Sequence, residues 1–191
     1  MNIISYNSKL EKEVKKSKFI SFLYKVESID EVNDYLNQLK KTYNDATHIC
    51  YAYIINSNMK YNDDNEPSGT AGVPILNVLK KHDLNYVLAV VVRYFGGIKL
   101  GSSNLLRTYL NITNENIKQN NIKKYIEEER LVISCPYDNL KLLNNLVKDY
   151  LIVSKNFDEL VTYEIIIDKI KINEFKKSLL NTNIIIKEKK N

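Results

Sequence analysis

The chain has 191 residues, of which 44% are hydrophobic and 27% are charged, and its formal net charge is +5 at pH 7. This composition is typical of a globular protein with a buried core, and it excludes a disordered chain. The modest positive charge permits contact with RNA or another polyanion without requiring it.

Sequence features also predict the compartment. No apolar run approaches the roughly 20 residues of a membrane span, and residues 1–19 lack the apolar core of a signal peptide. Cys50 and Cys135 lie far apart inside apolar runs and form no CxxC pair, which is typical of buried thiols in a reducing compartment. We therefore expect a cytoplasmic protein with no membrane partner and no cofactor.

The first predicted elements are a strand and a helix. Residues 18–26 (KFISFLYKV) are rich in aromatic and β-branched side chains, which favours a strand. Ser28 and Glu31 match a capping box, in which Glu31 would reach back to the N–H of Ser28. Apolar residues then recur at spacings of three and four, so we expect a helix that packs one face on a sheet.

Residues 47–56 (THICYAYIIN) predict a second strand with apolar side chains on both faces, and therefore an interior position in a sheet. His48 stands at its start. A histidine there is either a hydrogen-bonded structural residue or part of a site.

An acidic loop is expected next, over residues 56–70, because turn-forming residues fill this stretch. Asp63, Asp64 and Glu66 cluster there and offer oxygen atoms of the kind that Mg²⁺ prefers. The calcium-loop pattern is absent, and neighbouring carboxylates in a loop are usually solvated. We expect no metal.

A helix and a buried strand follow. Residues 72–82 predict the helix, with Pro74 in its first turn. Within residues 84–95 (LNYVLAVVVRYF), six consecutive apolar residues predict a strand that is covered on both faces. Arg93 is the first charge after that run. It is placed either for a site or for an internal ion pair with Asp63, Asp64 or Glu66.

Residues 96–103 (GGIKLGSS) link this strand to a helix expected over 104–118. Glycines allow close approach of the backbone, and free N–H groups at a helix start attract anions. Ser102 or Ser103 is the expected cap. The P-loop and dinucleotide-binding patterns are both missing. The predicted anion or nucleic-acid site consists of Arg93, Gly96, Gly97, Lys99, Gly101, Ser102 and Arg107.

The C-terminal part predicts strands at 129–135, 151–156, 160–168 and 183–188, with helices at 136–149 and 172–180. The order βαββαβ is that of a ferredoxin-like unit.

Five runs of the sequence together resemble the signature of the YigZ/IMPACT family. They are SKFI at 17–20, ATHICYAY at 46–53, DDNEPSGTAGVPILNVL at 63–79, VVVRYFGGIKLG at 90–101 and LLRTY at 105–109. We expect a bacterial-type two-domain member without the RWD domain of the eukaryotic proteins. Two places depart from the family pattern: Asn65 replaces a glycine, and Ser103 and Asn104 replace a frequent glycine pair.

The resemblance implies an α+β protein with two domains. Residues 1–124 would form a domain with the α/β fold of ribosomal protein S5 domain 2, and residues 125–191 a ferredoxin-like domain that resembles domain V of elongation factor G. It also implies a role in the regulation of translation, with RNA or the ribosome as partner, no sequence-specific contact with DNA and no established enzymatic activity.

Two classes of function follow. In the first, the protein is a binding module in which Arg93, Lys99 and Arg107 contact RNA phosphates and nearby tyrosines stack on bases.

In the second, it is an enzyme whose phosphorylated or anionic small substrate binds at the 96–103 loop. KLGSS at 99–103 resembles the phosphate loop of GHMP-type small-molecule kinases. Fold analogy alone does not establish that activity. The pocket would be completed by Arg93 and by His48, Asp63, Asp64 and Glu66.

Overall fold

The computed structural model describes residues 1–187, which form two compact units divided between Tyr125 and Ile126. Each unit combines helices with an antiparallel sheet, so the predicted α+β class is confirmed. In the described part of the chain, no helix is both long and apolar enough to cross a membrane.

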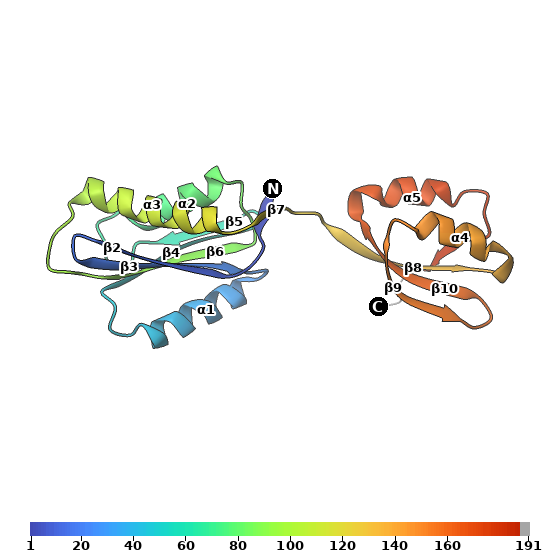
Figure 1. Cartoon of the computed structure of the whole chain (residues 1–191), viewed down its shortest axis with the longest axis horizontal. Coiled ribbons are helices and arrows are strands. Elements are labelled where there is room, and N and C mark those ends of the chain that lie inside the picture. Colours follow the sequence, from blue (N-terminus) through green and yellow to red (C-terminus); the bar gives the residue numbers. More distant parts are fainter. Residues whose placement is uncertain (188–191) are drawn as a thin grey trace. The chain divides into compact units, whose positions relative to one another are not determined.

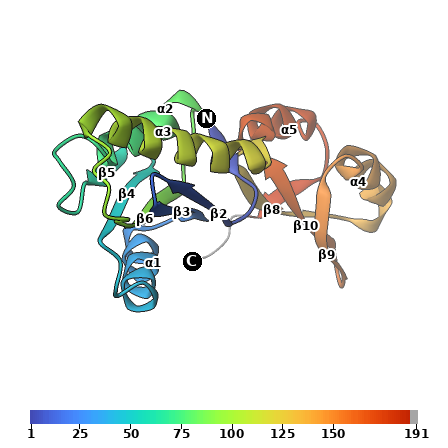
Figure 2. The ribbon, with the colours of Figure 1, turned by 60° about the vertical axis from the view of Figure 1, so that its left-hand side comes forward.

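The first unit is built on a five-stranded antiparallel sheet with helices on both faces (Figures 1 and 2). Helices α2 (Gly72–Lys81) and α3 (Ser102–Gln119) cover one face, and α1 (Ile29–Thr42) covers the other. A short pair, β1 (Asn2–Ile4) with β7 (Ile122–Lys124), lies outside this sheet. The sheet strands, in spatial order, are β2 (Ser8–Val14), β3 (Ser17–Lys25), β6 (Val87–Tyr94), β4 (His48–Ile55) and β5 (Asn58–Asn62).

Strand β6 is buried on both faces, as its valine run predicted, and it lies at the centre of this sheet. Its side chains alternate between two apolar cores, because successive residues of a strand point to opposite faces. Val87, Ala89 and Val91 belong to the core beneath α2 and α3. Leu88, Val90 and Val92 belong to the core over α1. The same alternation places Arg93 on the α2 and α3 face.

The predicted capping box forms in part. The Ser28 hydroxyl accepts from the Glu31 amide at 3.2 Å, as expected for the N-cap of α1. Glu31, however, accepts from the backbone N–H of Glu27 at 2.8 Å rather than from that of Ser28. The carboxylate therefore satisfies a donor one residue further from the helix than predicted.

Strand β5 was not predicted, because residues 56–70 were expected to form a loop throughout. Asn56 and Ser57 instead make a two-residue turn, with Asn56 at φ 54°, and the chain returns as an edge strand beside β4. All five residues of β5 are exposed, so no apolar alternation marks it in the sequence. Asn56 and Ser57, the two turn residues, were the signal in the sequence from which this hairpin could have been predicted.

The second unit has the predicted βαββαβ order. Strands β8 (Glu128–Cys135), β9 (Leu151–Phe157), β10 (Val161–Asp168) and β11 (Ile185–Lys187) form one antiparallel sheet in the order β11-β8-β10-β9. Helices α4 (Leu140–Val147) and α5 (Ile172–Ser178) lie on one face of it and enclose a separate core (Figure 1). The 3-10 turns η1 (Tyr137–Asn139) and η2 (Lys169–Lys171) lead into these helices.

Candidate anion-binding cleft

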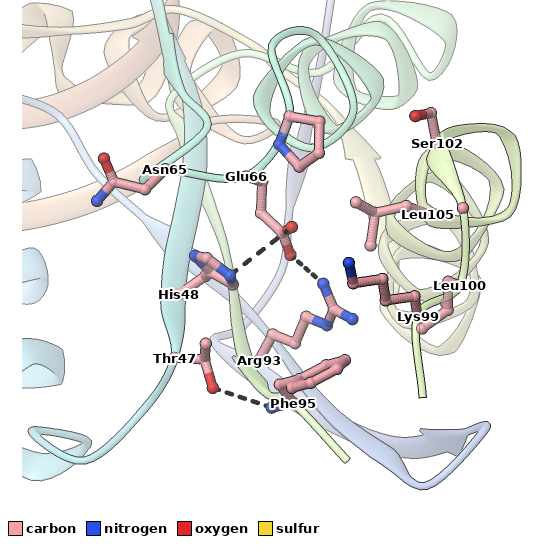
Figure 3. A pocket seen from close by; sticks show the side chains of 12 residues that line it. Thr47, His48, Asn65, Glu66, Arg93, Phe95, Lys99, Leu100, Ser102 and Leu105 are labelled. Carbon is pink, nitrogen blue, oxygen red and sulfur yellow. Dashed lines mark hydrogen bonds and ion pairs between the residues drawn. The ribbon is translucent and has the colours of Figure 1, made fainter. Parts of the chain in front are cut away.

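A cleft of about 470 Å³ opens in the first unit where β4 begins and β6 ends (Figure 3). Four separate segments of the chain form its wall. The lining residues are 47–48, 65–67, 93, 95, 99–102 and 105.

Strand register brings the central side chains of the cleft together. His48 of β4 and Phe19 of β3 are the direct cross-strand partners of Arg93 in β6. Residues opposite one another in an antiparallel sheet project from the same face, so all three side chains point toward α2 and α3. The Arg93 guanidinium lies 5.3 Å from the Phe19 ring centre and 5.5 Å from that of Phe95.

Glu66 is the acidic partner of this group. Its side chain is 2% exposed, and that of Arg93 is 6% exposed. Glu66 Oε1 accepts from Arg93 Nη1 at 2.6 Å and from the Tyr109 hydroxyl at 2.7 Å. The carboxylate is thus paired and hydrogen-bonded, as a buried charge must be.

Tyr109 and Cys50 lie behind Glu66. Burial raises the pKa of the Tyr109 hydroxyl well above its usual value, and the neighbouring Cys50 and Glu66 raise it further. Burial likewise raises the pKa of the Cys50 thiol. Both groups therefore keep their protons at neutral pH. Tyr109 acts as a hydrogen-bond donor to Glu66, and Cys50 is a structural thiol rather than a nucleophile.

His48 is held in one tautomer by the acidic loop. Its Nδ1 lies 2.8 Å from the backbone carbonyl oxygen of Asp64. A carbonyl oxygen can only accept, so Nδ1 carries the proton. Nε2 then faces Glu66 Oε2 across 3.7 Å, which is longer than a hydrogen bond. This gap lies at the wall of the cleft (Figure 3).

The opposite wall is the start of α3. Its N-cap is Gly101, with φ 82° and no side-chain cap, so the predicted Ser102 or Ser103 cap is wrong. In the first turn of α3, the Leu105 amide donates to the carbonyl oxygen of Gly101. The amides of residues 102–104 have no backbone acceptor among the described residues. Free amides at the N-terminus of a helix favour the binding of an anion.

Lys99 completes the positive side of the cleft. It is exposed, and its ammonium is directed toward the Glu66–Arg93 pair (Figure 3). It forms no ion pair with any of residues 1–187. Two cations, Arg93 and Lys99, face one carboxylate, Glu66, so the cleft keeps an excess of positive charge.

Arg93 has unused hydrogen-bonding capacity on this side. Its Nε is buried and has no hydrogen-bond partner, and the one hydrogen bond of its side chain within the described residues is that from Nη1 to Glu66. An arginine fork presents five donors, and the hydrogen bond to Glu66 uses one of them.

Six of the predicted site residues meet here and five do not. Those in the cleft wall are His48, Glu66, Arg93, Lys99, Gly101 and Ser102. Those outside it are Asp63, Asp64, Gly96, Gly97 and Arg107. Prediction missed Thr47, Asn65 and Phe95. Phe95, an exposed aromatic ring directly after a buried strand, was the detectable signal among them.

Asp63 and Asp64 belong to the fold rather than to the pocket where we placed them. Asp63 accepts from the amides of Gly69, Ala71 and Gly72 at 2.7–3.0 Å, and so caps α2 from the preceding loop. The Asp64 carboxylate accepts from the Ile49 amide of β4. Across residues 1–187, no three His, Cys, Asp or Glu side chains are grouped to hold a metal ion.

Replacing Asp63 with alanine is expected to lower the free energy of unfolding by about 2 kcal/mol, because three amides lose their acceptor together. Urea denaturation measures this loss. Asp34→Ala, an exposed position on α1, is the control. Equal stability of the two variants would show that the Asp63 cap contributes nothing.

Comparison with known proteins gives three kinds of match. Residues 15–117 match the family described as the Impact N-terminal domain. "IMPACT family member YvyE" of Bacillus subtilis is 37% identical over 167 residues, which cover 85% of this chain and 77% of the relative. "IMPACT family member YigZ" of Escherichia coli is 28% identical over 174 residues, covering 87% and 85%. A "Crystal structure of an hypothetical protein" aligns with a TM-score of 0.67 and 25% identity, over 99% of this chain and 98% of that one.

Proposed function

Because the chain belongs to the family of the Impact N-terminal domain, as its signature runs predicted, we propose that it is a non-enzymatic RNA-binding protein that regulates translation. Its RNA partner is free or part of the ribosome. The cleft between β4, β6 and α3 is the contact site.

The observation that carries this proposal is the pairing of anion donors with an exposed aromatic ring at one opening. Lys99, Arg93 and the free amides at the start of α3 suit phosphate oxygens. Phe95 is 45% exposed beside them and offers a face on which a base can stack. Phosphate donors next to an aromatic platform are the usual elements of single-stranded RNA recognition.

A second basic element adjoins this opening. The turn between β2 and β3 consists of Lys15 and Lys16, both exposed, with φ of 48° and 62°. Gly96 packs directly against the backbone of Lys16 and donates to the Ser17 hydroxyl at 3.2 Å. The turn therefore lies against the loop that leads to Lys99, and its two exposed lysines add positive charge near the proposed contact site.

Binding of single-stranded RNA is expected to weaken steeply as salt increases, since each neutralised phosphate releases counterions. Replacing Lys99 with alanine should lower the affinity and reduce the slope of log K against log salt by about 1. Fluorescence anisotropy across a salt series measures both. Lys41→Ala, at the end of α1 on the other face of the sheet, is the control and should leave the slope unchanged. Absence of RNA binding at low salt would refute the proposal.

A small-molecule enzyme is the second candidate, and two observations favour it. The cleft has a volume within the usual range of ligand pockets, roughly 300–1,000 Å³, and His48 Nε2 is accessible as an acid or base. Thermal-shift measurements with nucleotides and other anions test this. A ligand at a hundred times its Kd should stabilise the protein by about 2.7 kcal/mol. Stabilisation without turnover would favour the binding module.

A further inference from the structure

We propose that the cleft receives the phosphorylated terminal nucleotide of an RNA, with the terminal phosphate at the start of α3 and a ribose hydroxyl between His48 and Glu66. This inference rests on the proposed RNA binding and specifies which part of the RNA enters the cleft.

One side of the cleft is formed by buried residues. Glu66, Arg93, Leu100 and Leu105 line this side, and each is at least nine-tenths buried. We therefore place the terminal phosphate against this side and the rest of the RNA chain toward the opening.

The donors on the α3 side suit a phosphate monoester. Ser102, whose amide has no backbone acceptor among the described residues, the Lys99 ammonium and the Arg93 guanidinium, whose Nε has no hydrogen-bond partner among them, lie on this side. A phosphate monoester carries about 1.5–2 negative charges near neutral pH and three acceptor oxygens, against one charge for an internal diester. Several donors and two cations match the monoester better.

On the other side of the cleft, His48 Nε2 and Glu66 Oε2 face one another. With the ring neutral, His48 Nε2 presents a lone pair, since Nδ1 donates to the Asp64 carbonyl. Glu66 Oε2 is also an acceptor, and both hydrogen bonds to this carboxylate go to Oε1. The two acceptors face one another at 3.7 Å. A hydroxyl group of the ligand could donate a hydrogen bond to one of these two acceptors.

A ribonucleotide carries all the groups that these surfaces require. Its phosphate supplies acceptors for the α3 side, its ribose supplies a hydroxyl donor, and its base can stack on Phe95 at the opening. The 2′-hydroxyl, which DNA lacks, can act as donor or acceptor. The site should therefore distinguish phosphorylated from unphosphorylated ends, and RNA from DNA.

The test uses the full chain and internally labelled single-stranded oligonucleotides of one sequence. The RNA carries a 5′-phosphate, a 3′-phosphate or hydroxyls at both ends, and a DNA set matches it. Fluorescence anisotropy should show that one phosphorylated RNA end binds about tenfold more tightly than the hydroxyl-ended RNA, the effect of one charge-assisted hydrogen bond.

Two variants separate the halves of the site. Lys99→Ala should remove most of the preference for the phosphorylated end. His48→Phe should reduce the preference for RNA over DNA and leave the phosphate preference intact. Lys41→Ala should change neither ratio. Because each readout is a ratio measured on one protein sample, partial unfolding of a variant does not mimic the expected change.

The outcomes are distinguishable from those of the proposed function. Salt-sensitive RNA binding that ignores the end phosphate would overturn this inference and leave RNA binding standing. No RNA binding would overturn both. Competition by a free nucleoside monophosphate with the same affinity as the phosphorylated RNA would identify a free nucleotide as the ligand, and would overturn the assignment to an RNA end.

Discussion

Replacing Glu66 with glutamine is expected to lower the free energy of unfolding by about 3–5 kcal/mol, the usual result of removing one partner from a buried ion pair. Glutamine keeps the shape of the side chain and an acceptor for the Tyr109 hydroxyl, so the change isolates the lost charge. Arg93, whose side chain is 6% exposed, would then hold an uncompensated charge in the protein interior. Chemical denaturation monitored by circular dichroism measures the loss.

The double variant Glu66→Gln with Arg93→Met is the decisive control. It removes both charges, and a neutral apolar replacement of a buried pair is often close to neutral in stability. We therefore expect the double variant to be more stable than Glu66→Gln alone. Additive losses would show that the two side chains do not act as a pair. The double variant should still lose binding in the cleft, since Arg93 lines it.

Much of the fold followed from periodicity, and the exceptions have identifiable causes. The valine run predicted that β6 is buried on both faces, because a strand with no polar face has to be covered on both sides. Strand β5 escaped prediction because its side chains are all exposed, and an edge strand paired through its backbone leaves no apolar alternation. Asn65, which stands where the family pattern has glycine, adopts φ 64°, a left-handed conformation that asparagine tolerates better than most residues do.

The site was less predictable, because it depends on which carboxylate of the acidic cluster turns inward. The sequence left Asp63, Asp64 and Glu66 equally open as partners of Arg93. Asp64 and Asn65 both adopt positive φ, and this turn separates Asp63, which caps α2, from Glu66, which faces β6. Composition predicts turns in this loop but does not say which of the three carboxylates they direct inward.

The pairing of His48 with Arg93 was likewise beyond sequence reasoning. The two residues are 45 positions apart and meet only because β4 and β6 are antiparallel neighbours in one particular register. A shift by one residue would place His48 on the opposite face, toward α1. Each residue was recognisable as lying at a strand end, and the register decided that they share a site.

Replacing Gly96 with alanine is expected to lower the free energy of unfolding by about 3 kcal/mol, at the upper end of the usual cost of overpacking. A Cβ at this position would lie 1.9 Å from the carbonyl oxygen of Lys16 and 2.6 Å from the amide nitrogen of Ser17. Both atoms are backbone, so no side-chain rotation relieves the clash. Either the turn between β2 and β3 or the loop after β6 has to move.

Gly97→Ala is the matched control. Gly97 has φ 83°, and a Cβ at this position would have no neighbouring atom within 4 Å. Alanine there meets only the cost of the left-handed backbone, about 1 kcal/mol. Urea denaturation of both variants separates the two effects, since one position lacks space and the other lacks conformational freedom. If Gly96→Ala were no less stable than Gly97→Ala, the contact between the turn and the loop would be too loose to position Lys15 and Lys16 beside the cleft.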